Sequence, residues 1–179
     1  MILSLAYYGS KWLRTRADPV TVFDDKLKEL IDDMIETMHV HRGIGLAATQ
    51  VKLNKRIFIT FVPRETEEED EELVPQEPKV YINPKILSFS DEFIEWEEAC
   101  LSLPGLSAFV PRPQSIDIEA YDQNGALFKE TLTDFYACNF LHENDHLNGV
   151  LYIDRLANKD KERLKKPLHD LKEKYKKRH

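Results

Sequence analysis

Two histidines spaced four residues apart are the clearest chemical signature in the sequence. They belong to the run His142-Glu143-Asn144-Asp145-His146, which has the form H-E-x-x-H. On a helix, residues i and i+4 lie one turn apart on the same face, so both imidazoles can bind one metal ion. The glutamate then lies beside the ion as a potential base. A catalytic site of this kind needs a third protein ligand and one open coordination position.

Several residues are candidates for that third ligand. Cys138 lies eight residues before His146, a helical separation of about 12 Å, so the two cannot share an ion and a packing role is expected for Cys138. Asp154 and Glu162 follow in the chain, and nothing local favours either. Cys100 lies in a loop or strand end that the fold could bring to the helix, and a thiolate suits Zn(II) or Fe(II). From spacing alone, a ligand and an inert buried cysteine are equally consistent with Cys100.

Length and charge limit the classes of function. A chain of 179 residues with 42% hydrophobic residues fits a single domain over residues 1–179. The net charge of −7 argues against a general nucleic-acid-binding surface, so we expect no DNA partner. The charge is uneven, because residues 155–179 hold 11 Lys and Arg against 4 Asp and Glu. We interpret 155–179 as a basic C-terminal helix or tail.

Cysteine usage and hydropathy indicate the compartment. The sequence has two cysteines far apart, which do not make a disulfide framework and favour a reducing, cytoplasmic compartment. The apolar start, residues 1–8, lacks a preceding basic region and is a poor signal peptide. No apolar run approaches the length of a membrane span. We therefore expect a cytoplasmic protein with no membrane partner.

The helices that must position the motif follow from periodicity. Leu27 to Met38 form one continuous apolar stripe with Asp24 or Asp25 as the cap and Gly43 as the end. The motif helix is expected between a cap at Thr133 and a closing Gly149. A charged helix is expected over Lys159 to Lys177, where Pro167 marks a kink or a break. Its apolar face carries Leu164, Leu168, Leu171 and Tyr175.

Strand patterns fill the middle of the chain. β-branched and aromatic runs predict strands over residues 56–62, 79–84 and 86–94. Residues 115–132 predict a hairpin with Asn124-Gly125 at its turn. Glu65 to Glu72, with seven acidic residues in eight, predicts a solvated loop. The fold class is therefore α+β, with mostly antiparallel sheets packed around a central helix that carries H-E-x-x-H.

Gly43 to Gln50 has two glycines and two alanines around a single amide. The pattern is consistent with a backbone that closely approaches another group. It is equally consistent with a helix C-cap followed by a tight loop. Together with two other segments, it resembles the peptide deformylase family. Gly43 to Gln50 is similar to the family motif G-x-G-x-A-A-x-Q, Glu98 to Ser102 to E-G-C-L-S, and His142 to His146 to H-E-x-D-H. The likeness covers most of residues 14–156.

The resemblance implies a role for each motif residue. It implies one divalent metal ion held by Cys100, His142 and His146. It implies Glu143 as the general acid and base, with the side-chain amide of Gln50 and the backbone N–H of Leu101 stabilising the oxyanion. By the same resemblance, a pocket for the methionine side chain is lined by Ile44, Gly45 and Cys138.

The reaction implied is removal of the N-formyl group from the formyl-methionine of newly made polypeptides, with release of formate. Fe(II) is the metal implied in cells, and Zn(II), Ni(II) or Co(II) also suit the family. Two alternatives stay open: a general H-E-x-x-H metalloprotease, and a non-catalytic or weakly active binding protein. The second is motivated by departures from the family pattern at Ala99 and Leu141, which stand where Gly and Gln are usual. Ser107 stands where many members carry an Arg that helps to hold the peptide backbone. The basic tail is either a ribosomal RNA contact or an amphipathic helix docked on the body.

Overall fold

The computed structural model describes residues 1–61 and 78–176. Its α-helices are α1 (Asp25–Val40), α2 (Asp134–Leu147) and α3 (Asn158–Tyr175). Short 3₁₀ turns span Lys11–Arg14, Ala48–Val51 and Tyr152–Arg155. Its strands are β1 (Gly45–Ala47), β2 (Ile57–Thr60), β3 (Lys79–Phe89), β4 (Phe93–Ala99), β5 (Ser107–Pro113), β6 (Ser115–Tyr121) and β7 (Leu127–Thr133). The predicted acidic loop from Glu65 to Glu72 lies outside the described residues.

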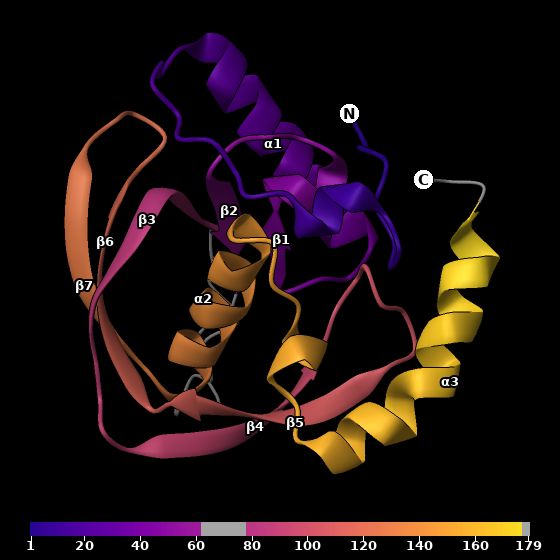
Figure 1. Cartoon of the computed structure of the whole chain (residues 1–179). Coiled ribbons are helices and arrows are strands. Elements are labelled where there is room, and N and C mark those ends of the chain that lie inside the picture. The colour runs from indigo at the N-terminus through magenta and orange to yellow at the C-terminus, as the bar shows by residue number, and fades with distance from the viewer. Residues whose placement is uncertain (62–77, 177–179) are drawn as a thin grey trace, which may run out of the picture.

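Two antiparallel sheets enclose helix α2 (Figure 1). One sheet has five strands in the order β1-β2-β3-β6-β7, and the other is the pair β4-β5. Helix α2 contacts strands of both sheets, and every residue from Ala137 to Leu147 is buried. A helix buried on all sides belongs to the core of the fold. The predicted α+β class with antiparallel sheets around a central helix is confirmed, and α2 carries the H-E-x-x-H run.

Helix α1 covers the sheet next to β1 and β2. Asp24 caps it, since its carboxylate accepts a hydrogen bond from the backbone N–H of Leu27 at 2.9 Å. The prediction that Gly43 ends the helix was wrong. Helix α1 ends at Val40, and Arg42 takes the left-handed conformation with φ 55°. Gly43 instead packs closely against Leu101, because a Cβ at Gly43 would lie 2.8 Å from Leu101 Cδ1.

The hairpin and the boundaries of α2 follow the sequence patterns. Strands β6 and β7 pair from Ser115 with Thr133 to Tyr121 with Leu127, and Gly125 takes φ 81° in the turn. Thr133 occupies the cap position of α2, but its side chain makes no capping hydrogen bond. Gly149 follows the helix with φ 70°, as a C-terminal glycine does.

Helix α3 is docked on the body through its apolar face. Leu164 and Leu171 are buried in a cluster with residues of β5 and of the 3₁₀ turn before α3, and Leu168 and Tyr175 pack against that cluster. The helix runs without a break through Pro167. Figure 1 shows it in yellow along one side of the molecule, with its last turn on the side where the N-terminal segment lies. None of the described helices is long and apolar enough to cross a membrane.

Candidate active site

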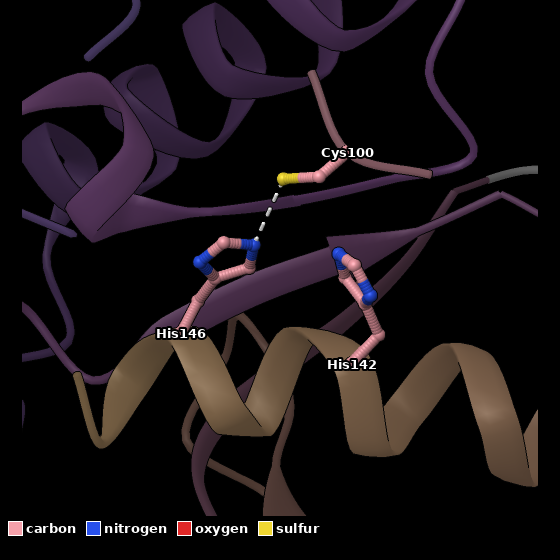
Figure 2. Close-up of side chains that lie close together, drawn as sticks. All are labelled: Cys100, His142 and His146. Carbon is pink, nitrogen blue, oxygen red and sulfur yellow. Dashed lines mark hydrogen bonds between the residues drawn. The ribbon is translucent and has the colours of Figure 1, made fainter. Parts of the chain in front are cut away.

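Cys100, His142 and His146 meet at one point in the fold. The two imidazoles project from one face of α2 toward Cys100, which directly follows β4 (Figure 2). Their ligand atoms all lie within 4.8 Å of one another, and Cys100 Sγ is 3.3 Å from His146 Nε2. The three side chains leave at most a tenth of their surface exposed. The structure thus brings together three residues that the sequence holds 42 and 4 positions apart.

This cluster fits a single divalent ion of borderline softness. A sulfur at about 2.3 Å and an imidazole nitrogen at about 2.1 Å from a tetrahedral ion are about 3.6 Å apart, close to the separation of Cys100 and His146. The other candidates for the third ligand serve elsewhere. Asp154 pairs with Arg14 at 2.5 Å, and Glu162 is exposed on α3. Cys138 lies outside the cluster of ligand atoms.

Glu98 fixes the orientation of His142. Its Oε2 lies 2.7 Å from His142 Nδ1, so that nitrogen donates to the carboxylate and leaves Nε2 as the ligand atom. Arg112 donates two hydrogen bonds to the same carboxylate, at 2.7 and 2.9 Å. Arg112 also donates to Asp145 at 2.7 Å, and Arg155 donates to Asp145 at 2.5 and 2.6 Å. The ligand helix is therefore tied to β4 and β5 by charged hydrogen bonds.

The roles of Glu98 and Arg112 were not predicted from the sequence. Burial works to raise the pKa of Glu98, but the hydrogen bonds from His142 and Arg112 lower it to about 2. Glu98 is thus ionised at neutral pH and cannot serve as a proton carrier. One signal was available, because residues two apart in a strand share a face and Glu98 precedes Cys100 by two. Nothing local pointed to Arg112, which approaches through the pairing of β4 with β5.

Glu143 has the properties of a general base. Its side chain is buried, with 3% of the residue exposed, and Oε2 has no hydrogen-bond partner among the described residues. Burial raises the pKa of Glu143 to about 7, although His142 opposes the shift. Its carboxyl group lies against Gly45, where a Cβ would come within 2.3 Å of Oε1. A residue without a side chain is needed at Gly45 to leave room for this carboxyl group.

Gln50 and Leu101 each have an N–H group close to Cys100 in the fold or in the chain. The backbone N–H of Ala47 donates to Gln50 Oε1 at 2.8 Å, which fixes the amide so that its nitrogen faces Cys100. That nitrogen lies 3.4 Å from Cys100 Sγ and 3.2 Å from Ser102 Oγ. Among the described residues, no hydrogen-bond acceptor is recorded for the backbone N–H of Leu101. The side-chain amide of Gln50 and the backbone N–H of Leu101 are therefore candidate donors for a developing oxyanion.

A cavity of about 620 Å³ opens beside the cluster. Ile44, Gly45 and Cys138 line it, as do Glu143 and Gln50. The structure therefore places the three residues expected in a substrate pocket on one cavity. It also adds aromatic lining residues that the sequence did not single out for this role: Tyr7, Trp96, Phe135 and Tyr175. They come from four different segments, so only the fold brings them together.

The departures from the family pattern leave this geometry intact. Ala99 is the exposed last residue of β4 and is absent from the described residues with positive φ, so alanine fits the backbone there. Leu141 is buried in the core cluster behind α2 with Phe140 and Leu147. Ser107 does not line the cavity. Its hydroxyl group donates a hydrogen bond to Glu97 at 2.7 Å.

Comparison with known proteins decides the family. The profile described as polypeptide deformylase matches residues 2–162. The chain belongs to the peptide deformylase family. The peptide deformylase of Pseudomonas aeruginosa is 41% identical over 167 residues, covering 93% of this chain and 94% of that protein. Peptide deformylase 1 of Pseudomonas syringae is 40% identical over the same shares of the two chains.

Solved deformylase structures share the fold. The Plasmodium falciparum peptide deformylase is 36% identical with a TM-score of 0.88, covering 98% of this chain and 99% of that chain. The Thermotoga maritima peptide deformylase is 38% identical with a TM-score of 0.79, covering 88% and 99%. The predicted family, enzyme class and reaction are confirmed: this deformylase is a hydrolase that removes the N-formyl group from newly made polypeptides. The general metalloprotease is not supported.

Proposed function

We propose that this deformylase uses one divalent ion held by Cys100, His142 and His146, with Fe(II) as the metal in cells. The observation that carries the proposal is the convergence of one thiol and two imidazoles within 4.8 Å. A bound ion would supply Lewis acidity to a water molecule and to the formyl carbonyl group. Zn(II), Ni(II) and Co(II) suit the same donor set.

In this proposal Glu143 moves the proton. It accepts a proton from the water that attacks the formyl carbon and delivers it to the amine nitrogen as the C–N bond breaks. A carboxyl group with a pKa of about 7 can both accept and release a proton near neutral pH. The products are formate and a peptide with a free amino terminus.

Gln50 and Leu101 are proposed to stabilise the tetrahedral intermediate. The side-chain amide of Gln50 and the backbone N–H of Leu101 donate to the oxygen on which negative charge develops. Both donors are fixed before substrate arrives, Gln50 by the hydrogen bond from Ala47. Loss of one such donor typically costs about 10²- to 10³-fold in rate.

We propose that the peptide binds in the cavity in extended form, with its methionine side chain against Ile44, Gly45 and Cys138. Among the described strands, β1 pairs only with β2. Its other edge is available for backbone hydrogen bonds to a substrate strand. Backbone bonding of this kind is independent of side chains, so it suits an enzyme that acts on many different nascent chains.

The role of Glu143 and the metal set is tested by formate release from formyl-Met-Ala under anaerobic conditions. Protein loaded with Fe(II) is expected to release formate, and the Glu143→Gln variant is expected to lose about 10²-fold or more in kcat while retaining bound metal. A matched control is Glu95→Gln, because Glu95 is exposed on β4 and lies outside the cavity lining. Wild-type activity in Glu143→Gln would overturn the assignment and favour a different base.

We further propose that residues 1–179 form one cytoplasmic catalytic domain whose basic segment 155–179 contacts ribosomal RNA. Helix α3 buries its leucines and leaves Lys165, Lys166 and Lys172 exposed, so docking on the body and binding RNA use opposite faces. Replacing these three lysines by Glu should weaken ribosome binding and its dependence on salt. The control for net charge is the same change at three exposed lysines outside α3: Lys26, Lys28 and Lys55. Unchanged ribosome binding in the α3 variant would refute the contact.

A further inference from the structure

Two tyrosines from opposite ends of the chain form a stacked pair on the wall of the active-site cavity. The ring centroids of Tyr7 and Tyr175 lie 3.9 Å apart, and the ring planes differ by 11°. Both residues line the cavity, and both are partly exposed. The pair therefore presents aromatic surface to the occupant of the cavity. Neither residue belongs to the reacting groups or to the family motifs.

The backbone on each side of Tyr7 is bonded to the catalytic elements. The N–H of Ala6 donates to the carbonyl oxygen of Gln50 at 2.7 Å, and the N–H of Tyr8 donates to the carbonyl oxygen of Ser102 at 2.9 Å. The side-chain nitrogen of Gln50 lies 3.4 Å from the Cys100 thiol and 3.2 Å from Ser102 Oγ. The segment that carries Tyr7 is thus fixed beside the oxyanion donors, and the position of its ring relative to the reaction centre is set by the backbone.

Tyr175 is fixed by the apolar stripe of α3. Leu164, Leu168, Leu171 and Tyr175 follow one another at intervals of four, three and four residues, which is one face of a helix. Leu164 is 3% exposed and Leu171 is 8% exposed, so they anchor the helix. Tyr175 continues the stripe toward the end of α3 and lines the cavity. The C-terminal helix therefore supplies part of the substrate-facing surface.

The chemistry of this wall differs from that of the base of the cavity. Glu143 and Gln50, which are proposed for proton transfer and oxyanion binding, lie near Cys100 at the base of the cavity. The tyrosine pair offers only aromatic rings and hydroxyl groups. A cavity of about 620 Å³ is in the size range of sites that hold a ligand larger than one amino acid. Residues that follow formyl-methionine in a peptide therefore have room beside the wall.

We propose that the Tyr7–Tyr175 pair is a specificity-determining wall that contacts side chains downstream of formyl-methionine and favours aromatic ones. The inference rests on the deformylase function of the site and adds a selectivity to it. Contact between a substrate ring and the pair would strengthen binding, because offset or edge-to-face aromatic contacts are favourable beyond their area. The wall touches no reacting atom, so its contribution is expected in KM and not in kcat.

The test compares four proteins on one set of peptides. Wild type, Tyr175→Ala, Tyr175→Phe and Tyr136→Ala are assayed on formyl-Met-Ala-Ala-Ala and on peptides with Phe at the second, third or fourth position. Tyr136 is a matched control, since it is 42% exposed on α2 and lies outside the cavity lining. Binding of the deformylated product peptides by calorimetry gives a readout independent of turnover, and thermal unfolding reports on the docking of α3.

Wild type should show a KM about 3- to 10-fold lower for the best Phe-containing peptide than for the alanine peptide. Tyr175→Ala should abolish this preference, in KM and in product binding, while kcat on the alanine peptide stays unchanged. Tyr175→Phe and Tyr136→Ala should retain the preference. A wall with only a structural role would lower the Tm in Tyr175→Ala and leave the preference intact, which would overturn the proposal.

Two further results would also count against it. A wild-type enzyme without a preference for Phe at any of the three positions would overturn the proposal. A Tyr175→Ala variant whose KM rises equally for every peptide would overturn it as well. The alanine peptide separates these outcomes from a failure of the deformylase function itself. If wild type loaded with metal released no formate from that peptide, the catalytic assignment would fail, whereas formate release without a Phe preference refutes the wall alone.

Discussion

The two buried carboxyl groups beside His142 have opposite properties although each lies next to a ligand. Glu98 accepts hydrogen bonds from His142 and Arg112, which lower its pKa to about 2. Glu143 lacks such donors at Oε2 among the described residues, and burial raises its pKa to about 7. Separation of two pKa values by environment distinguishes a structural anion from a proton carrier. Glu143 is therefore the carboxyl group with which a reaction near neutral pH can exchange protons.

Gly45 is expected to be essential for that carboxyl group. In Gly45→Ala the new methyl group would lie 2.3 Å from Glu143 Oε1, so the carboxyl group must move away from its position. We expect kcat to fall by about 10²-fold or more, which is the usual contribution of a positioned acid or base. Steady-state kinetics on formyl-Met-Ala gives this value.

The control for a general cost of replacing glycine is Gly125→Ala. Gly125 has φ 81° and lies in the β6–β7 turn, away from the cavity. That variant should lower the Tm and leave kcat unchanged. A Gly45→Ala enzyme with wild-type kcat would contradict the steric account of Glu143.

Cys138 is expected to be chemically inert in the folded protein. It is 2% exposed, and burial raises the pKa of its thiol from 9.0 to about 11. Because the folded-state pKa is raised above the unfolded value, this group favours folding below pH 9 and loses that contribution as the pH rises toward 11. Alkylation with iodoacetamide should be slow at pH 8 in native protein and fast after denaturation, since only the thiolate reacts.

Peptide mass mapping distinguishes Cys138 from Cys100 in that experiment. The Cys138→Ser variant shows the background from Cys100 alone. Rapid labelling of Cys138 in folded protein at pH 8 would contradict its burial on α2 in the wall of the cavity.

Some individual residues could be predicted from the sequence and others could not. The i, i+4 histidines carry their geometry in their spacing, because a helix fixes both side chains on one face. Three motif matches then selected Cys100 from the open candidates. Glu98, Arg112 and the tyrosine pair escaped prediction because their contacts cross between strands or between chain ends. Contacts of that kind depend on tertiary structure and leave no local periodicity.

At the scale of elements, β4, β5 and α2 form one rigid unit around the ligands. The chain of hydrogen bonds runs from His142 to Glu98, then through Arg112 to Asp145. The side chains of Glu98, Arg112 and Asp145 are each less than a tenth exposed. Buried charges of this kind persist only when each has its partner. The β4–β5 pair therefore supports the proposed ligand His142, and β4 leads directly into Cys100.

Glu98→Gln tests this support directly. The amide keeps the shape of the side chain but removes the charge that Arg112 and His142 share. We expect metal affinity to fall about 10- to 100-fold, the usual cost of losing a partner of a ligating histidine. Competition with a chelator, followed by metal analysis, gives the affinity.

Glu95→Gln is the matched control on the same strand, because Glu95 is exposed and on the outward side of β4. It should retain wild-type affinity. If Glu98→Gln also bound metal as tightly as wild type, the orientation of His142 would not depend on this carboxylate.

Element boundaries were predictable where the pattern was local. The stripe of α1, the Asn124-Gly125 turn and the apolar face of α3 all appear in the structure. The order β1-β2-β3-β6-β7 was not predictable, because strand pairing depends on distant segments. The end of α1 was also misjudged. Arg42 adopts positive φ, and the N–H of Gly43 after it donates to the carbonyl oxygen of Met38 in the last turn.

At the scale of the whole molecule, both chain ends contribute to one cavity. The N-terminal segment reaches the oxyanion donors through Ala6 and Tyr8, and α3 reaches the cavity through Tyr175. Residues near both ends of the described chain therefore line the cavity beside α2.

Metal stoichiometry measured together with formate release tests the central claim most directly. Protein purified without oxygen, stripped with a chelator and titrated with Fe(II) is assayed on formyl-Met-Ala. Activity should rise linearly and saturate at one ion per chain, and Cys100→Ala should neither bind the ion tightly nor release formate. Full activity in the stripped protein, or in Cys100→Ala, would contradict a metal centre built from Cys100, His142 and His146.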